Sequence, residues 1–291
     1  MKYFSYFKKL QHFIVIALVT IFFTSIATSS ETNKKNFNDK KVKKDKIQKI
    51  VSKKIKYKAG KVTLIGDIFY NENSSTKKPG IIVIHEWWGN NDYSKTRAKM
   101  LAELGYVAFA ADMYGNGLVV DNPNDAQKEA SLIYSNPTIL KERFNAAYET
   151  LIKNNLVDSK HIAAIGYCFG GTVVLNAANI GIPLDAVVVF HGGLKGFKAD
   201  SVINKSHILV CNGAEDKFVT SDDIANFKKS MDQVSANYEF INYKGATHAF
   251  TNPSSTETGK KFNMPIAYNE KADIDSWNDM QKFFAKYFPA K

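Results

Sequence analysis

Three side chains that can act together in nucleophilic catalysis each follow an apolar run of this sequence. Cys168 comes after "HIAAIGY", Asp216 after "HILVCNGAE" and His248 after "YEFINYKGAT". A cysteine thiolate is a nucleophile, a histidine can take up its proton, and a carboxylate can orient the imidazole. Each residue alone also has a structural explanation: Cys168 as a small residue at a turn, Asp216 as a turn or cap residue, and His248 as a loop histidine. The three in this order indicate a catalytic triad.

The residues around the cysteine favour a sharp turn between a strand and a helix. The segment "GYCFG" places Gly166 and Gly170 two residues before and after Cys168. This spacing matches G-x-nucleophile-x-G, and the order nucleophile, acid, histidine is that of the α/β-hydrolase triad. Glycines at these positions let the strand and the helix approach closely. The backbone N–H of Phe169, at the start of the expected helix, is a candidate oxyanion donor.

A carboxylate and a second candidate oxyanion donor follow another apolar run. "HEWWG" comes directly after "IIVI", and the loop at this point supplies the second oxyanion N–H in such folds. We expect the backbone N–H of Trp87 to have that role and Glu86 to lie beside the thiol. The structural alternative for Glu86 is an ion pair or a helix cap near Asn91 or Ser94.

Aromatic residues at the ends of the apolar runs are candidates for a substrate pocket, with burial in the core as the alternative. They are Trp87, Trp88, Tyr114 and Phe250. We interpret His85 and His191 as structural. No close-set pair of residues has the spacing of metal ligands, so no metal site is expected.

Strands and helices alternate from residue 60 onward. Strands are expected at 61–70, 81–85, 106–110, 161–166, 186–191, 207–213 and 238–243, and helices at 94–105, 141–153, 171–179, 221–235 and 272–288. This alternation predicts an α/β fold, with a doubly wound, mostly parallel sheet in a single domain over residues 59–291. Ligands of such sheets bind beyond the carboxyl ends of the strands, where the candidate residues lie.

The positive charge of the chain is confined to its N-terminal part. The formal net charge is +11, but residues 1–61 hold 16 lysines and 3 acidic residues, and the remainder holds 23 basic and 25 acidic residues. The expected domain is therefore nearly neutral, which argues against a nucleic-acid-binding function.

The N-terminus has the pattern of an export signal. Lysines precede the uncharged, mostly apolar run 13–27, and small residues near Ala27 fit a cleavage site there. We expect a signal peptide over residues 1–27, a lysine-rich linker over residues 28–58, and a periplasmic or secreted protein. The alternative is a retained N-terminal membrane anchor. Weak contact of the linker with a membrane or the cell envelope is one interpretation, and a solvated tether is the other.

The chain has two cysteines, Cys168 and Cys211. Each closes or follows an apolar run rather than lying on a loop that a disulfide would hold, so we interpret both as free thiols. Redox cycling between them is the alternative.

The sequence resembles the dienelactone hydrolase (carboxymethylenebutenolidase-like) family over residues 60–290. The matching segments are "IIVIHEWWGNNDY", "LAELGYVAFAADMYG", "IAAIGYCFGGTVVLNAA", "VCNGAEDKFV" and "YKGATHAFTNP". The resemblance implies a hydrolase of lactones and small esters, with a triad of Cys168, Asp216 and His248 and without a cofactor. It also implies that Glu86 holds the resting thiol until substrate displaces it.

The resemblance further implies an arginine on a middle helix that binds a substrate carboxylate, here Arg143. The family also has an arginine shortly after the catalytic histidine, and "HAFTNPSS" contains none. We therefore expect a small-molecule ester or lactone as substrate, and the missing arginine leaves open whether the pocket takes the usual dicarboxylate lactone. The alternative is a catalytically weak ligand-binding protein with the same fold.

Overall fold

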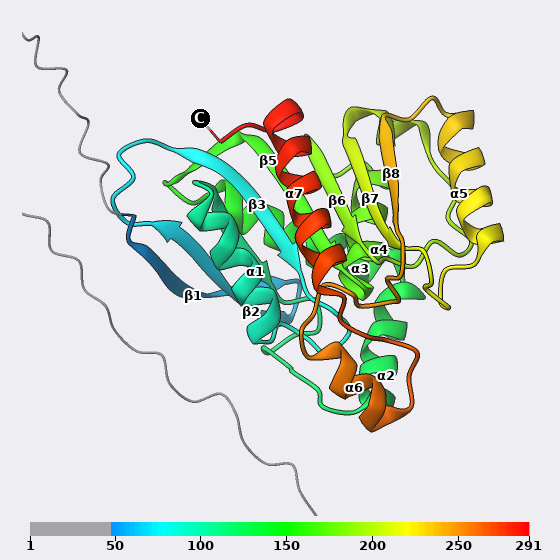
Figure 1. Cartoon of the computed structure of the whole chain (residues 1–291). Helices are drawn as coiled ribbons and strands as arrows, with labels where there is room; N and C mark the ends of the chain where they lie inside the picture. Colours follow the sequence, from blue (N-terminus) through cyan, green and yellow to red (C-terminus); the bar gives the residue numbers. More distant parts are fainter. Residues whose placement is uncertain (1–47, 291) are drawn as a thin grey trace, which may run out of the picture. The chain divides into compact units, whose positions relative to one another are not determined.

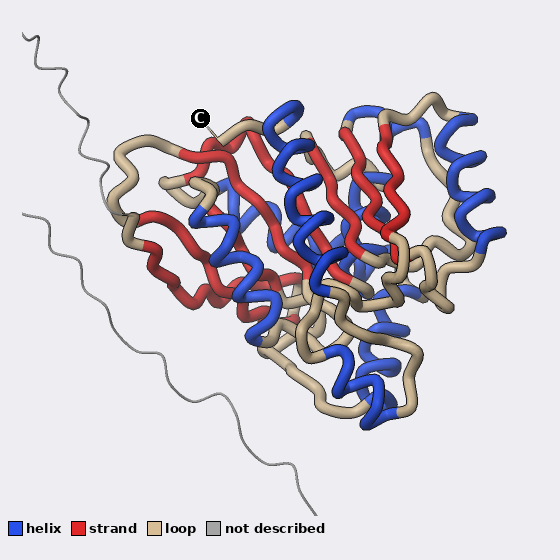
Figure 2. Tube along the Cα trace, in the orientation of Figure 1, coloured by secondary structure: helices blue, strands red, loops and turns tan. Residues whose placement is uncertain are grey.

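An eight-stranded sheet runs through the middle of the computed structural model, which describes residues 48–290, and helices cover both of its faces (Figures 1 and 2). The strands are β1 (Ile50–Ala59), β2 (Val62–Asn71), β3 (Lys78–Ile84), β4 (Val107–Ala111), β5 (Val157–Tyr167), β6 (Ala186–Phe190), β7 (His207–Gly213) and β8 (Tyr238–Tyr243). The helices are α1 (Asp92–Glu103), α2 (Pro123–Tyr134), α3 (Pro137–Ile152), α4 (Phe169–Asn179), the 3₁₀ helix η1 (Ser201–Lys205), α5 (Ser221–Gln233), α6 (Ser255–Phe262) and α7 (Glu270–Tyr287).

The strand order brings the candidate residues to one edge of the sheet. The order is β1-β2-β4-β3-β5-β6-β7-β8; β1 and β2 pair antiparallel with each other and β2 pairs antiparallel with β4, and all other pairs are parallel. Parallel strands all end at the same edge, so the segments after β3, β5, β7 and β8 meet there. Those segments carry Glu86, Cys168, Asp216 and His248. The predicted α/β fold with a mostly parallel sheet is confirmed.

Each face of the sheet has its own apolar core. Alternate residues of a strand point to opposite faces. In β3, Ile81 and Val83 join a core with α1 and α7, whereas Ile82 and Ile84 join a core with α2, α3, α4 and α5. In Figure 1, α7 (red) crosses in front of the strands. The central strands are buried on both faces, which explains their continuous apolar sequences.

The structure corrects the expected start of the domain. Residues 50–58, assigned to the linker by their many lysines, belong to β1, which pairs along its whole length with β2. Ile55, Tyr57 and Ala59 turn toward the domain, and the lysines between them are exposed. This period-two pattern was the signal of a half-buried strand, and the lysine content concealed it.

Two helices were not expected from the sequence. The segment 123–134 is α2, which Asn122 caps and which buries Ala126, Ala130 and Ile133 on one face. Helix α6 is the second. Helix α1 begins at Asp92, slightly earlier than expected, after its cap Asn91, and α5 begins at Ser221, after its cap Thr220.

The predicted signal peptide of residues 1–27 and the predicted linker up to residue 47 lie outside the described residues. Export, a retained anchor and contact of the linker with a membrane or envelope therefore stay predictions. Among residues 48–290, no helix combines the length and the apolar character needed to cross a membrane.

A buried tyrosine fastens β1 to the loop that follows β4. The hydroxyl of Tyr57 donates to the carbonyl oxygen of Asp112 at 3.1 Å and accepts from its N–H at 3.0 Å. The Asp112 carboxylate accepts four backbone N–H groups of the surrounding segments, including those of Tyr114 and Gly115. This loop carries part of the site described below, so β1 contributes to its position.

We expect Tyr57→Phe to lower the free energy of unfolding by about 1–3 kcal/mol, because it leaves two buried backbone groups of Asp112 without their partner. Urea unfolding of the purified variant measures this loss. Lys56→Ala, at an exposed position of the same strand, is the matched control and should change stability by less than about 0.5 kcal/mol. Equal stability of Tyr57→Phe and the wild type would show that β1 is not fastened in this way.

Candidate active site

The cysteine occupies a strained turn between β5 and α4. Cys168 has φ 53° and ψ −114°, a conformation that a residue with a side chain rarely adopts. Such conformations cost on the order of 1–3 kcal/mol and persist only where the surroundings impose them. The turn places the thiol beyond the carboxyl end of the sheet and at the N-terminus of α4.

Close backbone contacts impose this turn. A Cβ atom on Gly166 would lie 2.0 Å from the carbonyl oxygen of Gly170, and a Cβ atom on Gly170 would lie 2.3 Å from that of Ile84. Neither neighbour can move aside, because both are backbone atoms, one in α4 and the other at the end of β3. The interpretation of the glycines around Cys168 is therefore confirmed.

The backbone N–H of Cys168 is hydrogen-bonded to the end of the neighbouring strand, β6. It donates to the carbonyl oxygen of Phe190 and to Nδ1 of His191, both at 3.0 Å. Since Nδ1 accepts, the proton of His191 is on Nε2, which lies 2.7 Å from Oγ1 of Thr251. Burial lowers the pKa of His191 well below its usual value, so the ring stays neutral. His191 is structural, as predicted, but its role in holding the nucleophile turn was missed.

His248 lies within hydrogen-bonding distance of both other triad candidates, the thiol of Cys168 and the carboxyl group of Asp216. His248 Nε2 lies 3.1 Å from Cys168 Sγ, and His248 Nδ1 lies 2.7 Å from Asp216 Oδ2. The carboxyl group of Asp216 is fully buried and its other oxygen accepts the backbone N–H of Phe218. The ring of Phe218 packs edge-on against His248, with the centroids 5.0 Å apart.

The surroundings of His248 favour its protonated form. Burial alone would lower the pKa of the imidazole. The negative charge of a Cys168 thiolate and the hydrogen bonds with Asp216 and Cys168 outweigh burial and raise the pKa of His248 to about 10. A proton that leaves the thiol is therefore retained on the histidine.

Glu86 is buried beside the triad and its oxygen is engaged elsewhere. Its Oε2 accepts a hydrogen bond from Nδ2 of Asn252 at 2.6 Å, and the side chain is almost fully buried. Burial raises the pKa of Glu86 to about 7, against the opposing effects of Asn252, His248 and Arg97. Among the described residues no hydrogen bond joins Glu86 to the thiol. The alternative role at the start of α1 is wrong, since Asn91 caps that helix with its own side chain.

A pocket of about 260 Å³ opens onto the thiol. Its walls are mainly apolar and are formed by Glu86, Trp87, Trp88, Gln127, Tyr134, Cys168, Phe169, Gly193, Phe218, His248, Ala249, Met264 and Ile266. Trp88 was a predicted pocket residue. The backbone N–H groups of Trp87 and Phe169 have no acceptor among the described turns and caps, and Phe169 is the first residue of α4.

Three predicted pocket residues lie behind the pocket wall. Arg143 is 7 % exposed and its Nη1 donates to the carbonyl oxygens of Met113 and Tyr114. The hydroxyl of Tyr114 donates to the carbonyl oxygen of Trp87 at 2.8 Å. Phe250 is fully buried between His191 and Tyr243. The expectation that these side chains contact substrate is corrected: Arg143 and Tyr114 hold the loops, and Phe250 fills the core.

Four further pocket residues come from segments whose structure the sequence did not predict. Gln127 and Tyr134 lie on α2, and Met264 and Ile266 follow α6. The weak signal was the Asn122–Pro123 start of α2, a cap followed by proline at the first helical position.

Cys211 is separated from the pocket by the sheet. It is fully buried in the core beneath α7, whereas Cys168 packs against the core on the other face, and both thiols are free. Burial raises the pKa of Cys211 to about 12. These placements argue against a redox pair. Within residues 48–290, no group of three or more His, Cys, Asp or Glu side chains could hold a metal ion.

Comparisons with known proteins agree with this geometry. A model of the "Dienelactone hydrolase family" matches residues 65–288. "Protein usf" of Aquifex pyrophilus is 30% identical over 214 residues, which cover 72% of this chain and 88% of the relative. A crystal structure of a dienelactone hydrolase-like promiscuous phosphotriesterase from metagenomic libraries is 32% identical, with a TM-score of 0.77, and covers 82% of this chain and 98% of the other. Esterase 2 of Thermogutta terrifontis, at 16% identity and TM-score 0.53, shares the fold.

The sheet, the turn at Cys168 and the order of the site residues define an α/β-hydrolase. Within that class, the chain belongs to the dienelactone hydrolase family and is a carboxylic ester or lactone hydrolase.

The buried Glu86 predicts a specific pH dependence of stability. The pKa of its carboxyl is about 7 in the folded protein and 4.5 without burial, so the folded state binds more protons between these pH values and stability falls as pH rises. Glu86→Gln keeps an acceptor for Asn252 and removes the charge. We expect it to be more stable than the wild type by about 3 kcal/mol at about pH 8, with the difference disappearing toward pH 4.5.

Urea unfolding at a series of pH values measures this difference. Glu103→Gln, at an exposed carboxylate paired with Lys99 on α1, is the control and should show no such trend. A constant difference between Glu86→Gln and the wild type across the series would contradict the account of Glu86.

Proposed function

We propose that the protein hydrolyses a small carboxylic ester or lactone through an acyl-enzyme intermediate on Cys168. His248 is the general base and acid, Asp216 orients its imidazole, and the backbone N–H groups of Trp87 and Phe169 bind the oxyanion. The observation that carries the proposal is the unbroken contact from Asp216 through His248 to the thiol, at 2.7 Å and 3.1 Å.

The first half of the reaction forms a thioester. The Cys168 thiolate attacks the carbonyl carbon while His248 Nε2 holds the proton of the thiol. The carbonyl oxygen becomes negative and is stabilised by the two N–H groups and by the N-terminus of α4. When the C–O bond breaks, the alkoxide leaving group takes the proton from His248, so the leaving group lies on the histidine side of the pocket.

The second half of the reaction releases the acid. Water loses a proton to His248 and attacks the thioester, and the sulfur leaves as a thiolate that the imidazolium pairs with. The high pKa of His248 favours this ion pair at the end of each cycle. In this account the chain needs no cofactor.

The pocket supports a substrate without a strong negative charge. Among residues 48–290, no lysine or arginine lines it, and Glu86 is its one carboxylate. A dicarboxylate lactone would find no cation there, because Arg143 is engaged with backbone carbonyls. We propose neutral or weakly charged esters and lactones as the substrate class.

We further propose that Glu86 controls the thiol, as the family resemblance implies. Its position in the wall of the pocket that Cys168 also lines, and a pKa of about 7, support this. The export of the protein, suggested by the sequence of residues 1–27, is also a proposal.

We expect Cys168→Ala and His248→Ala each to lower kcat/KM for p-nitrophenyl acetate by at least about 10³-fold, because the triad acts as a unit. Cys168→Ser tests whether sulfur itself is needed and should also be strongly impaired. Cys211→Ala is the control, since it removes the other thiol at a site remote from the pocket. Retention of wild-type turnover in Cys168→Ala would refute the mechanism. Binding of esters without turnover by the wild type would favour the ligand-binding alternative.

A further inference from the structure

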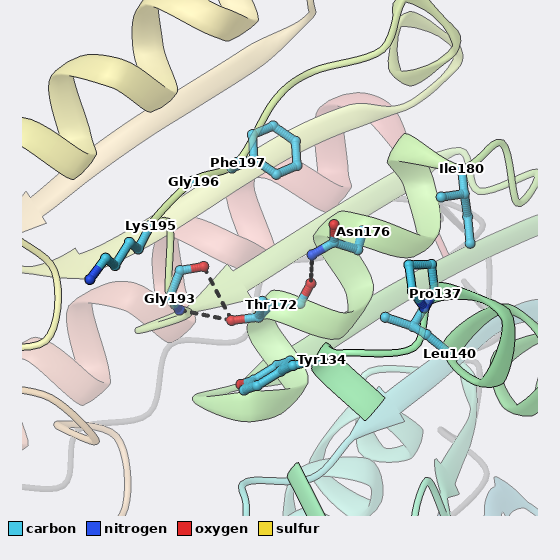
Figure 3. A pocket seen from close by; sticks show the side chains of 10 residues that line it. All are labelled: Tyr134, Pro137, Leu140, Thr172, Asn176, Ile180, Gly193, Lys195, Gly196 and Phe197. Atoms are coloured by element: carbon cyan, nitrogen blue, oxygen red, sulfur yellow. Dashed lines mark hydrogen bonds between the residues drawn. The ribbon is translucent and has the colours of Figure 1, made fainter. Parts of the chain in front are cut away.

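A second cavity, of about 440 Å³, lies beside the catalytic pocket and has no role in the mechanism above. It is a groove between α2, α3, α4 and the loop after β6 (Figure 3). Its walls are formed by Tyr134, Pro137, Leu140, Thr172, Asn176, Ile180, Gly193, Lys195, Gly196 and Phe197.

The groove adjoins the catalytic pocket. Tyr134 and Gly193 line both cavities, so the two cavities meet at these residues. The ring of Tyr134 lies 5.3 Å from that of Phe169, the residue next to the nucleophile. In Figure 3, Gly193 and Ile180 lie at opposite sides of the groove, and of these two residues only Gly193 also lines the catalytic pocket.

The walls of the groove suit an apolar chain. Pro137, Leu140, Ile180 and Phe197 are apolar, and among the described residues that line the groove Lys195 is the one charged side chain. The polar wall residues are largely engaged within the chain. The hydroxyl of Thr172 donates to the carbonyl oxygen of Gly193 and accepts its N–H, and Nδ2 of Asn176 donates to the carbonyl oxygen of Thr172 (Figure 3).

The groove lies on the acyl side of the scissile bond, which is the part of the substrate that stays attached to Cys168 in the proposed intermediate. The leaving group must lie next to His248, which protonates it. His248 and its neighbours Phe218 and Ala249 line the catalytic pocket but not the groove. The part of a substrate that enters the groove is therefore the acyl part.

We propose that this groove is an acyl-chain subsite, and that the substrates are esters or thioesters with an extended apolar acyl chain. The inference rests on the proposed function, because it uses the thiol and His248 to orient the substrate. It goes further in naming the part of the substrate that is recognised and the residues that select it. Tyr134, at the junction of the two cavities, is the residue that the chain must pass.

The expected preference can be stated as a rate ratio. Each methylene moved from water into an apolar groove contributes about 0.8 kcal/mol, or about fourfold in kcat/KM when fully buried. The groove is open to solvent along one side, so we expect about two- to fourfold per methylene from butyrate to octanoate, with a common p-nitrophenol leaving group.

Asn176→Trp tests the subsite by filling it. The side chain of Asn176 is half-buried in the groove and bonds only within its own helix. We expect octanoate hydrolysis to fall by about 10-fold or more while acetate hydrolysis stays near wild type, because acetate does not reach the groove. Ile180→Trp, at the far end, should shorten the preferred chain in the same way. Leu132→Ala, at an exposed apolar position of α2 outside both cavities, is the control and should leave the chain-length profile unchanged.

A flat or falling chain-length profile in the wild type would overturn the proposal, as would an unchanged octanoate-to-acetate ratio in both tryptophan variants. A second set of measurements uses acetate esters of alcohols of increasing length. If Asn176→Trp lowers kcat/KM for the long-alcohol esters and not for the long-acyl esters, the groove holds the leaving group and the acyl assignment is overturned. Failure of the catalytic proposal is distinguishable, because Cys168→Ala would then still hydrolyse acetate, whatever the chain-length profile.

Discussion

The turn at Cys168 is the constraint on which the rest of the site depends. A residue with a side chain is held at φ 53°, and the cost is offset by contacts that only glycine permits and by hydrogen bonds to the strand alongside. The turn directs the thiol into the pocket, exposes the first N–H of α4 and sets the distance to His248. His191 supports the turn from β6 as a neutral acceptor, so a buried histidine that takes no part in the proposed chemistry still determines where the sulfur lies.

Two buried acidic groups have opposite environments in this site. The carboxylate of Asp216 accepts hydrogen bonds from His248 and from the backbone N–H of Phe218. Glu86 has one amide partner and is otherwise desolvated, and its pKa is raised to about 7. The fold thus gives one carboxylate two hydrogen-bond partners within the triad and leaves the other, in the wall of the same pocket, close to its titration point. A group in that state can change its protonation with a small change in its surroundings.

Much of the fold and of the site arrangement could be predicted from the sequence, because buried parallel strands are continuous apolar runs and functional residues follow them directly. The positions of Cys168, Asp216 and His248 after β5, β7 and β8 followed from this rule alone. The pocket walls could not be predicted. Tyr134 depends on α2, a helix whose buried face consists of two alanines and one isoleucine within a polar segment, and the direction of Arg143 depends on carbonyl groups whose positions only the folded loops determine. Strand β1 was missed because its exposed face is almost entirely lysine.

The acyl-thioester at Cys168 is the central claim, and it can be observed directly. Wild-type protein mixed with p-nitrophenyl acetate and quenched in acid within the first turnover should carry one acetyl group per chain by intact mass. Peptide mapping should locate that group on Cys168. Rapid release of acetate without an acetylated chain, or an acetyl group found on another residue, would contradict the account.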